Sequence, residues 1–270
     1  MLAVVAGLGA YCLPGASLAG NIGIYGDKCY GDHSAGIIAA TGNTPVALST
    51  LTAGSLAGLQ ALFIDGCSFA TNDAVNTAVN NGLVLIWHDP NWSGPANKQL
   101  PGVAGLPYIS GGNGAAVDFP VASPVLTGPG GTLNDSSLDN GSSSTHGYFD
   151  QVSLPVGATV LANQGVATRI VSFAYTYGAG RVVYSTIPLT CYFSGGPCVG
   201  SPATSGMQAY AKNVIAWAAP GFTSCAAEGF GGTKLTLCRQ VCEMNYTGTK
   251  LNALIRTWTS LYHEDPPCAN

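Results

Sequence analysis

Side chains able to take part in proton transfer stand at the ends of short apolar runs in the first ninety residues. Asp27 follows the first run, Asp65 ends a later one, and His88 and Asp89 close another. Two carboxylates and an imidazole are groups that serve general acid–base catalysis or bind a metal ion. The alternative is structural: Asp65 caps the next turn and His88 bonds a backbone carbonyl. His88 and Asp89 are not a catalytic pair in themselves, because successive strand residues point apart.

Three further groups of polar residues are candidates for chemistry. His146 ends a polar loop and either reaches the same site or is an exposed loop histidine. Asn134-Asp135 and Asp139-Asn140 offer oxygen ligands suited to calcium, but their spacing matches no calcium-binding loop. We therefore predict no metal site and no cofactor.

The cysteines indicate disulfides. The chain has nine, and eight remain when Cys12 is assigned to a leader: Cys29, Cys67, Cys191, Cys198, Cys225, Cys238, Cys242 and Cys268. An even number at close spacings is typical of an oxidising compartment. Cys238 and Cys242 also have the spacing of a zinc-ligand pair, but Cys225 and Cys268 have no close partner. Three pairings of these last four cysteines stay open.

The N-terminal stretch resembles a signal peptide. Residues 1–19 carry no charge, and Ser17 and Ala19 place small residues at −3 and −1 of a cleavage site before Gly20. No basic residue precedes Lys28, so the alternative is a buried first strand or helix. No later apolar run approaches the ~18–20 residues needed to span a bilayer. We expect an exported, secreted or periplasmic protein without a membrane span.

The composition limits the classes of partner. Charged residues make up 8% of the chain, against about 25% in typical soluble domains. The net charge is −4 and no cluster of Lys and Arg occurs, so a nucleic-acid partner is not expected. Hydrophobic residues make up 47%, which is enough for a sizeable core. A surface of small neutral residues tolerates association with copies of itself, so a homo-oligomer is one expected assembly.

The elements that would position these side chains alternate between strands and helices. Ser34 or Asp32 is expected to cap one helix, and Thr71 or Asn72 a second helix that ends near Val79. This alternation predicts βαβ units and a mainly parallel sheet. The expected strands span residues 21–25, 45–48, 60–65 and 83–87.

The rest of the chain is predicted in three parts. Residues 90–147 are rich in turn formers and read as loops, with short strands near 116–121. A β-hairpin over 170–187 and a helix over 206–218 follow. The composition then shifts at Pro220-Gly221. We place an α/β domain at 20–220 and a cysteine-rich module at 221–270 with short helices over 235–244 and 251–262.

The order of these elements resembles the class I glutamine amidotransferase-like superfamily, in its trehalose-utilisation-type branch. The residues that carry the resemblance are Phe63–Gly66, Leu83–His88, the stretch Tyr177–Thr186, and Asn213–Ala218 as "N-x-x-x-W-A". The resemblance implies a flavodoxin-like open sheet with an added β-hairpin. A small disulfide-rich helical module completes the predicted α/β fold.

The sequence departs from that superfamily at its catalytic residue. In that superfamily the fourth strand leads into a G-x-C-x-G turn that carries the nucleophilic cysteine. In this sequence the corresponding stretch is Trp87-His88-Asp89-Pro90, which contains neither cysteine nor glycine. Glutaminase chemistry is therefore not predicted. In the flavodoxin strand order, strands one and three are neighbours, so Cys29 and Cys67, which follow these strands, would lie side by side. A disulfide between them would close the mouth of the crevice where a ligand would otherwise bind. The alternative, Cys67 as a free nucleophile, needs a low pKa and a nearby base.

A carbohydrate partner is the remaining alternative. Trp87, Trp92, Tyr108 and Tyr148 are candidates for an aromatic platform, unless Trp87 belongs to the core. Sequons for N-glycosylation stand at Asn91, Asn134, Asn140 and Asn245.

Three functions follow from these observations. The leading hypothesis is an exported non-catalytic protein used for extracellular binding or self-assembly. The alternatives are an extracellular, carbohydrate-acting hydrolase using Asp27, Asp65 and His88, and a cell-surface carbohydrate-recognition domain.

Overall fold

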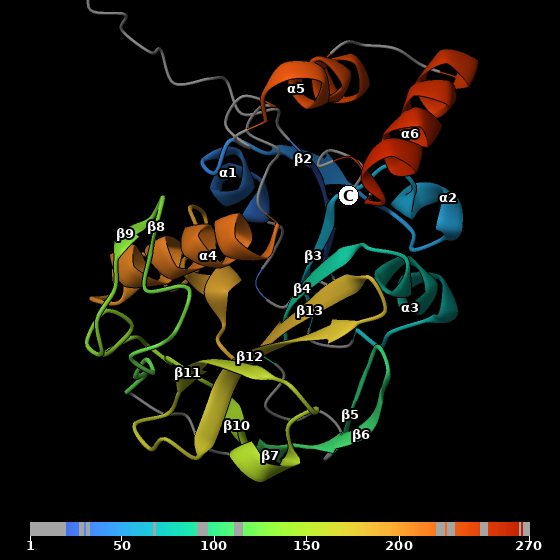
Figure 1. The fold of residues 1–270 in the computed structure, drawn as a ribbon. Coiled ribbons are helices and arrows are strands. Elements are labelled where there is room, and N and C mark those ends of the chain that lie inside the picture. The colour runs from blue at the N-terminus through green and yellow to red at the C-terminus, as the bar shows by residue number, and fades with distance from the viewer. Residues whose placement is uncertain are drawn as a thin grey trace, which may run out of the picture. The chain divides into compact units, whose positions relative to one another are not determined.

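The computed structural model places most of the chain in two compact units (Figure 1). Ala19–Gly221 form the main unit, and Phe222–Asn270 belong to the second, here called the C-terminal module. The expected leader lies outside the described residues. The structure describes residues 20–26, 30, 33–66, 69–90, 97–110, 116–219, 225, 230–243, 248–264 and 266.

The main unit is built on a nine-stranded, mainly parallel sheet. The parallel strands are β1 (Asn21–Gly26), β2 (Thr44–Ala47), β3 (Ala61–Asp65), β4 (Val84–His88) and β13 (Gly180–Ser185). They are ordered β2-β1-β3-β4-β13. This is the flavodoxin-like 2-1-3-4-5 order of doubly wound folds. The predicted α/β fold class is therefore confirmed.

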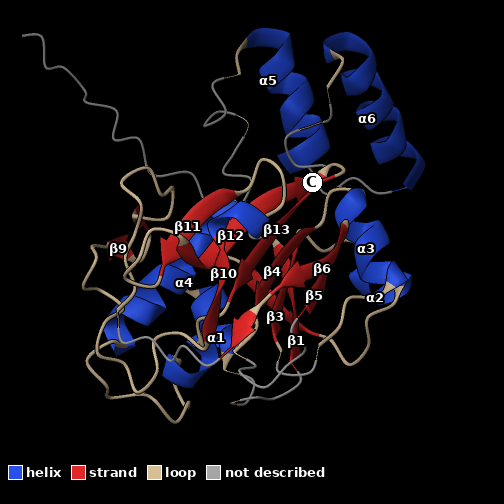
Figure 2. Cartoon of the chain, turned by 90° about the horizontal axis from the view of Figure 1, so that it is seen from below, coloured by secondary structure: helices blue, strands red, loops and turns tan. Residues whose placement is uncertain are grey.

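Helices cover both faces of this sheet (Figure 2). Alternate strand residues point to opposite faces, so Phe63 and Ile86 join one core cluster whereas Leu62 and Leu85 join the other. The first cluster includes residues of α1 (Ser34–Ala39) and α4 (Thr204–Ala218). The second includes residues of α2 (Ala53–Leu56) and α3 (Asp73–Asn80). Burial on both faces explains why the central strands are continuously apolar.

The helix starts follow the expected chemistry in only one of the two predicted cases. Asn72 caps α3, because its side chain accepts a hydrogen bond from the Val75 amide. The prediction that Ser34 caps α1 is wrong: Ser34 is the first helical residue, and His33 precedes it without a side-chain cap. Asp32 lies outside the described residues.

Antiparallel strands extend the sheet beyond β13. The predicted hairpin is confirmed as β12 (Arg169–Tyr177) and β13, and Gly178 in its turn has a φ of 60°. β12 also pairs with β10 (Gly147–Asp150) and β11 (Thr159–Asn163). The strands expected at 116–121 are wrong, because only an isolated bridge from Asp118 to Asn163 forms there. The remaining strands are β5 (Asn97–Leu100), β6 (Val103–Pro107), β7 (Ile109–Ser110), β8 (Thr127–Gly128) and β9 (Gly131–Thr132).

The C-terminal module is helical and contains a disulfide. Its elements are α5 (Gly232–Cys238), the π-helical turn η3 (Arg239–Glu243) and α6 (Gly248–Tyr262). Cys225 pairs with Cys238. Cys268 and the side chain of Cys242 lie outside the described residues. In the part of the chain that the structure describes, no helix is long and apolar enough to cross a membrane.

A lysine surrounded by aromatic rings packs the module together. The Lys234 ammonium lies 4.5, 5.5 and 4.9 Å from the ring centres of Phe230, Trp258 and Tyr262. It also pairs with Glu264 at 2.7 Å. These contacts join both helices around the buried ring of Trp258.

Candidate functional site

The carboxyl ends of three neighbouring strands bring polar side chains into one row. Asp65 on β3 is the register partner of His88 on β4, which is in turn the partner of Ser185 on β13. Register partners of parallel strands point to the same face, so all three side chains face the α1 and α4 side. Sequence reasoning missed Ser185, although it ends the hairpin strand that carries the resemblance. Asp27 lies outside the described residues, as do Cys29 and Cys67, so the predicted crevice disulfide stays a prediction.

His88 is buried and uncharged in this row. Its side chain is fully buried, and its ring centre lies 5.1 Å from that of Phe63. Within the described residues, neither ring nitrogen has a hydrogen-bond partner. Burial disfavours the imidazolium and lowers the pKa of His88 to about 3. A general base must lie within hydrogen-bonding reach of the proton that it removes, and this imidazole makes no hydrogen bond to any described residue.

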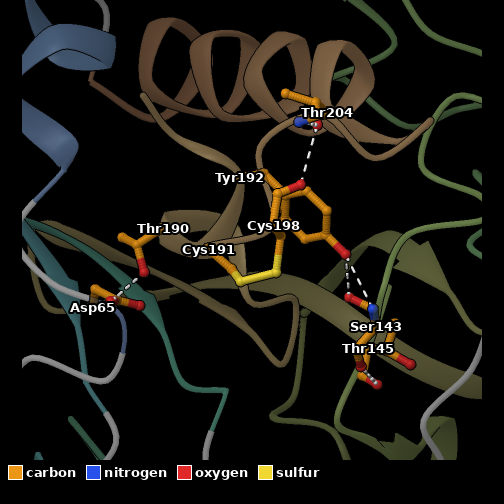
Figure 3. The surroundings of a disulfide bond; sticks show 9 residues. Asp65, Ser143, Thr145, Thr190, Cys191, Tyr192, Cys198 and Thr204 are labelled. Atoms are coloured by element: carbon orange, nitrogen blue, oxygen red, sulfur yellow. Dashed lines mark hydrogen bonds between the residues drawn. A yellow bond between two sulfur atoms is a disulfide. The ribbon is translucent and has the colours of Figure 1, made fainter. Parts of the chain in front are cut away.

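Asp65 is held by a buried threonine (Figure 3). The Thr190 hydroxyl donates a hydrogen bond to Asp65 Oδ2. Thr190 belongs to the 3-10 turn η2 (Leu189–Tyr192), and the next residue, Cys191, forms a disulfide with Cys198. The carboxylate therefore anchors a disulfide-closed turn over the end of β3.

The same turn holds a second loop through Tyr192. Its hydroxyl donates to the Ser143 carbonyl oxygen at 2.7 Å and accepts from the Ser143 amide at 3.1 Å (Figure 3). The disulfide, Asp65 and the Ser143 loop thus form one connected set of contacts.

Removing this disulfide is expected to destabilise the main unit. The double variant Cys191→Ser/Cys198→Ser should lower its free energy of unfolding by about 2–3 kcal/mol, because a short loop is no longer closed in the unfolded chain. Urea denaturation followed by circular dichroism measures the change. The matched control, Cys225→Ser/Cys238→Ser in the C-terminal module, should leave the main-unit transition in place. An unchanged transition in the first variant would show that the disulfide adds nothing to stability.

Asp89 forms a buried ion pair. Its Oδ2 lies 2.9 Å from Lys98 Nζ, and both side chains are 4% exposed. The Tyr184 hydroxyl donates to the same oxygen at 2.6 Å, and the Lys98 ammonium lies 4.6 Å from the Tyr108 ring centre. Burial and the nearby Asp89 carboxylate raise the pKa of Tyr184 well above its ordinary value. Asp89 therefore holds the β5–β6 hairpin to the sheet.

His146 is also a structural residue here. The expectation of an exposed loop histidine is wrong, because the side chain is buried. Its Nδ1 lies within hydrogen-bonding distance of the Pro90 carbonyl oxygen. The Tyr108 hydroxyl donates to the His146 carbonyl oxygen at 2.5 Å. The structure therefore places His146 beside the segment that follows β4.

The alternative of an aromatic platform for sugars does not hold for Trp87 and Tyr108, since both rings are buried. Trp87 packs on Phe69 and Tyr184 in the core. Tyr148 is half-buried under the Arg169 guanidinium, and Trp92 lies outside the described residues. Of the four sequons, Asn134 and Asn140 are exposed, and Asn91 and Asn245 lie outside the described residues.

The acidic loop residues also have structural contacts. Asp135 and Asp139 accept hydrogen bonds from the Phe119 and Val117 amides at 2.9 and 2.8 Å. Burial, and to a smaller degree these two carboxylates, raises the pKa of Asp118. Across the described ranges, no group of three or more His, Cys, Asp or Glu side chains is arranged to hold a metal ion.

Comparisons with known proteins find only distant structural similarities. No protein-family model and no curated protein matches the sequence. One similar solved structure is a cytoplasmic protein of Salmonella typhimurium LT2. It is 14% identical, the match covers 74% of this chain and 99% of that chain, and the TM-score is 0.48. A second cytoplasmic protein of Salmonella typhimurium is 12% identical, with 72% of this chain and 97% of that chain covered and a TM-score of 0.42. The chain is also similar to a ThuA-like protein of Parabacteroides merdae ATCC 43184, at 14% identity over 74% and 89% with a TM-score of 0.35. Likenesses at this level carry no argument about chemistry.

Proposed function

We propose that this chain is an exported, non-catalytic protein whose main unit serves extracellular binding or self-assembly. The observation that carries the proposal is that the candidate acid–base residues are buried and that the carboxylates make structural contacts. Asp65 receives a hydrogen bond from Thr190, and Asp89 forms a buried ion pair with Lys98. His88 is buried and neutral. Asp65 and Asp89 thus support the fold at two different points, and His88 is not in a state suited to proton transfer at neutral pH.

Export is supported by the disulfides. Cys191–Cys198 and Cys225–Cys238 are typical of a non-reducing compartment. The sequence of residues 1–19, which is uncharged and has small residues before Gly20, also supports the proposal, because it resembles a signal peptide.

One observation favours the alternative, an extracellular carbohydrate-acting hydrolase. Asp65, His88 and Ser185 occupy one row at the carboxyl edge of the sheet, where ligands bind in folds of this class. For hydrolysis, His88 would have to gain a hydrogen-bonding partner and contact with solvent. We therefore keep this function as the second candidate, with Asp27 as a further carboxylate.

A turnover assay separates the two candidates. The purified full chain is incubated with chromogenic glycosides and esters, with and without divalent metal ions. His88→Ala is the test variant and His263→Ala, an exposed histidine, is the control. We expect no turnover by the wild-type chain. Turnover that His88→Ala abolishes and His263→Ala preserves would overturn the non-catalytic proposal.

A further inference from the structure

Gly20, which precedes β1, is held by a side chain as well as by the neighbouring strands. The Gly20 amide donates a hydrogen bond to Asn43 Oδ1 at 3.2 Å. Its carbonyl oxygen accepts one from the Thr44 amide at 2.9 Å, and the Gln60 amide donates to the Asn21 carbonyl oxygen at 2.9 Å. The chain at this point therefore lies between the starts of β2 and β3.

The Asn43 side chain is buried, and hydrogen bonds orient its oxygen towards Gly20. Asn43 Nδ2 donates to Thr41 Oγ1 at 2.9 Å, and the Thr41 hydroxyl donates to the Ile38 carbonyl oxygen at 2.7 Å. Because the nitrogen of this side-chain amide is used in this way, the atom directed at the Gly20 nitrogen is the oxygen, which can only accept. Asn43 is thus a preformed acceptor for an N–H group at Gly20.

A second side-chain oxygen lies against Gly20. A β-carbon at position 20 would lie 1.6 Å from Gln60 Oε1, so this oxygen occupies the space where another residue would carry its side chain. A backbone amide offers one hydrogen to these acceptors, whereas an ammonium offers three. The surroundings of Gly20 therefore suit a terminal ammonium.

We propose that a signal peptidase cuts the chain between Ala19 and Gly20 and that Asn43 then binds the new terminal ammonium. The inference rests on the export stated in the proposed function and names the residue that receives the mature N-terminus. Hydrolysis breaks the bond between the Ala19 carbonyl carbon and the Gly20 nitrogen. Water supplies the second carboxylate oxygen to Ala19 and its protons to the nitrogen, which is an ammonium at neutral pH because α-amino groups ordinarily have a pKa of about 7.7–8.0.

The hydrogen bonds around Gly20 are in place before the cut. Those from Thr44 and Gln60 involve carbonyl groups on the Gly20 side of the broken bond, so they remain. The contact with Asn43 Oδ1 becomes charge-assisted and therefore stronger than the amide contact that it replaces. Processing thus fixes the start of β1 more firmly.

Amine labelling of the exported protein tests the proposal. The full chain is expressed in a secretory host, the mass of the exported product gives its first residue, and the folded product is acylated near neutral pH. Chymotrypsin then releases residues 20–25, a peptide without lysine whose only amine is the terminal one. We expect a product that begins at Gly20. Its α-amine should react about tenfold more slowly in the wild type than in Asn43→Ala, because a hydrogen bond to a charged group must break first.

Two further variants make the test specific. Thr41→Val removes the hydroxyl that orients the Asn43 amide and should give an intermediate labelling rate. Asn72→Ala, the matched control, removes an asparagine that accepts from the Val75 amide and should leave the rate unchanged. Circular dichroism verifies that each variant folds.

The outcomes separate this inference from the proposed function. An exported product that keeps residues 1–19, or that begins at another residue, would overturn the inference and leave export standing. Equal labelling rates in the wild type and Asn43→Ala would exclude the role of Asn43. A chain that stays inside the host cell would contradict export, on which both proposals rest.

Discussion

Asp89→Asn and Lys98→Met will each lower the free energy of unfolding of the main unit by about 3–5 kcal/mol. Each substitution removes one partner of a buried ion pair whose atoms lie 2.9 Å apart and leaves the other charge buried. The Tyr184 hydroxyl cannot replace the ammonium, because a neutral donor does not balance the carboxylate charge.

A double-mutant cycle measures this coupling. The variant Asp89→Asn/Lys98→Met carries no buried charge at this position, so it should be more stable than either single variant. Glu264→Gln is the matched control, because it breaks the exposed pair with Lys234 and should cost less than about 1 kcal/mol. Urea denaturation gives all the values. Equal, small losses for Asp89→Asn and Glu264→Gln would show that the Asp89–Lys98 contact contributes no more than a surface pair.

His88→Leu will raise the free energy of unfolding at pH 7 by about 1–2 kcal/mol. Leucine has a similar volume and brings no polar atoms, whereas both nitrogens of His88 are buried without a hydrogen-bond partner among the described residues. The substitution therefore removes a desolvation cost without opening a cavity.

The same variant will also change the pH dependence of stability. The unfolded chain binds a proton at His88 near pH 6.5, whereas the folded chain does so only near pH 3. Between these values the unfolded state holds more protons, so lowering the pH from 7 to 4.5 costs about 3 kcal/mol of stability through this group.

His88→Leu should remove that part of the loss on acidification. His263→Leu, at an exposed position, is the control. Parallel pH profiles for the wild type and His88→Leu would contradict the assignment of a buried neutral imidazole.

The sheet was predictable because its strands are buried on both faces. The continuous apolar runs now seen as β3 and β4 predict buried parallel strands, and Asn72 marks the start of α3. The added strands β10 and β11 were not predicted, because their pairing with β12 joins segments that carry no strong alternation of their own. Local pattern thus identifies the core of the sheet but not its edge.

The site was predictable only in part. Three parallel strands ending at one edge do bring Asp65 and His88 into register, as reasoning from topology requires. The burial of Lys98 and His146 could not be predicted from the sequence, since both residues lie in polar segments. Lys98 contacts the Tyr108 ring, and His146 contacts the Pro90 carbonyl oxygen. Long-range contacts, rather than local chemistry, decide their roles.

The polar residues at the carboxyl edge of the sheet are proposed not to carry out proton transfer: Asp65 and Asp89 support the fold, and His88 is buried and neutral. An NMR titration of the His88 imidazole, with its resonances assigned by comparison with His88→Leu, tests this claim most directly. We expect His88 to stay neutral from pH 8 to about pH 4, because burial lowers its pKa to about 3. A titration midpoint near 6.5, the ordinary value, would contradict the account, because it would show an imidazole that solvent reaches and that acid–base chemistry can use.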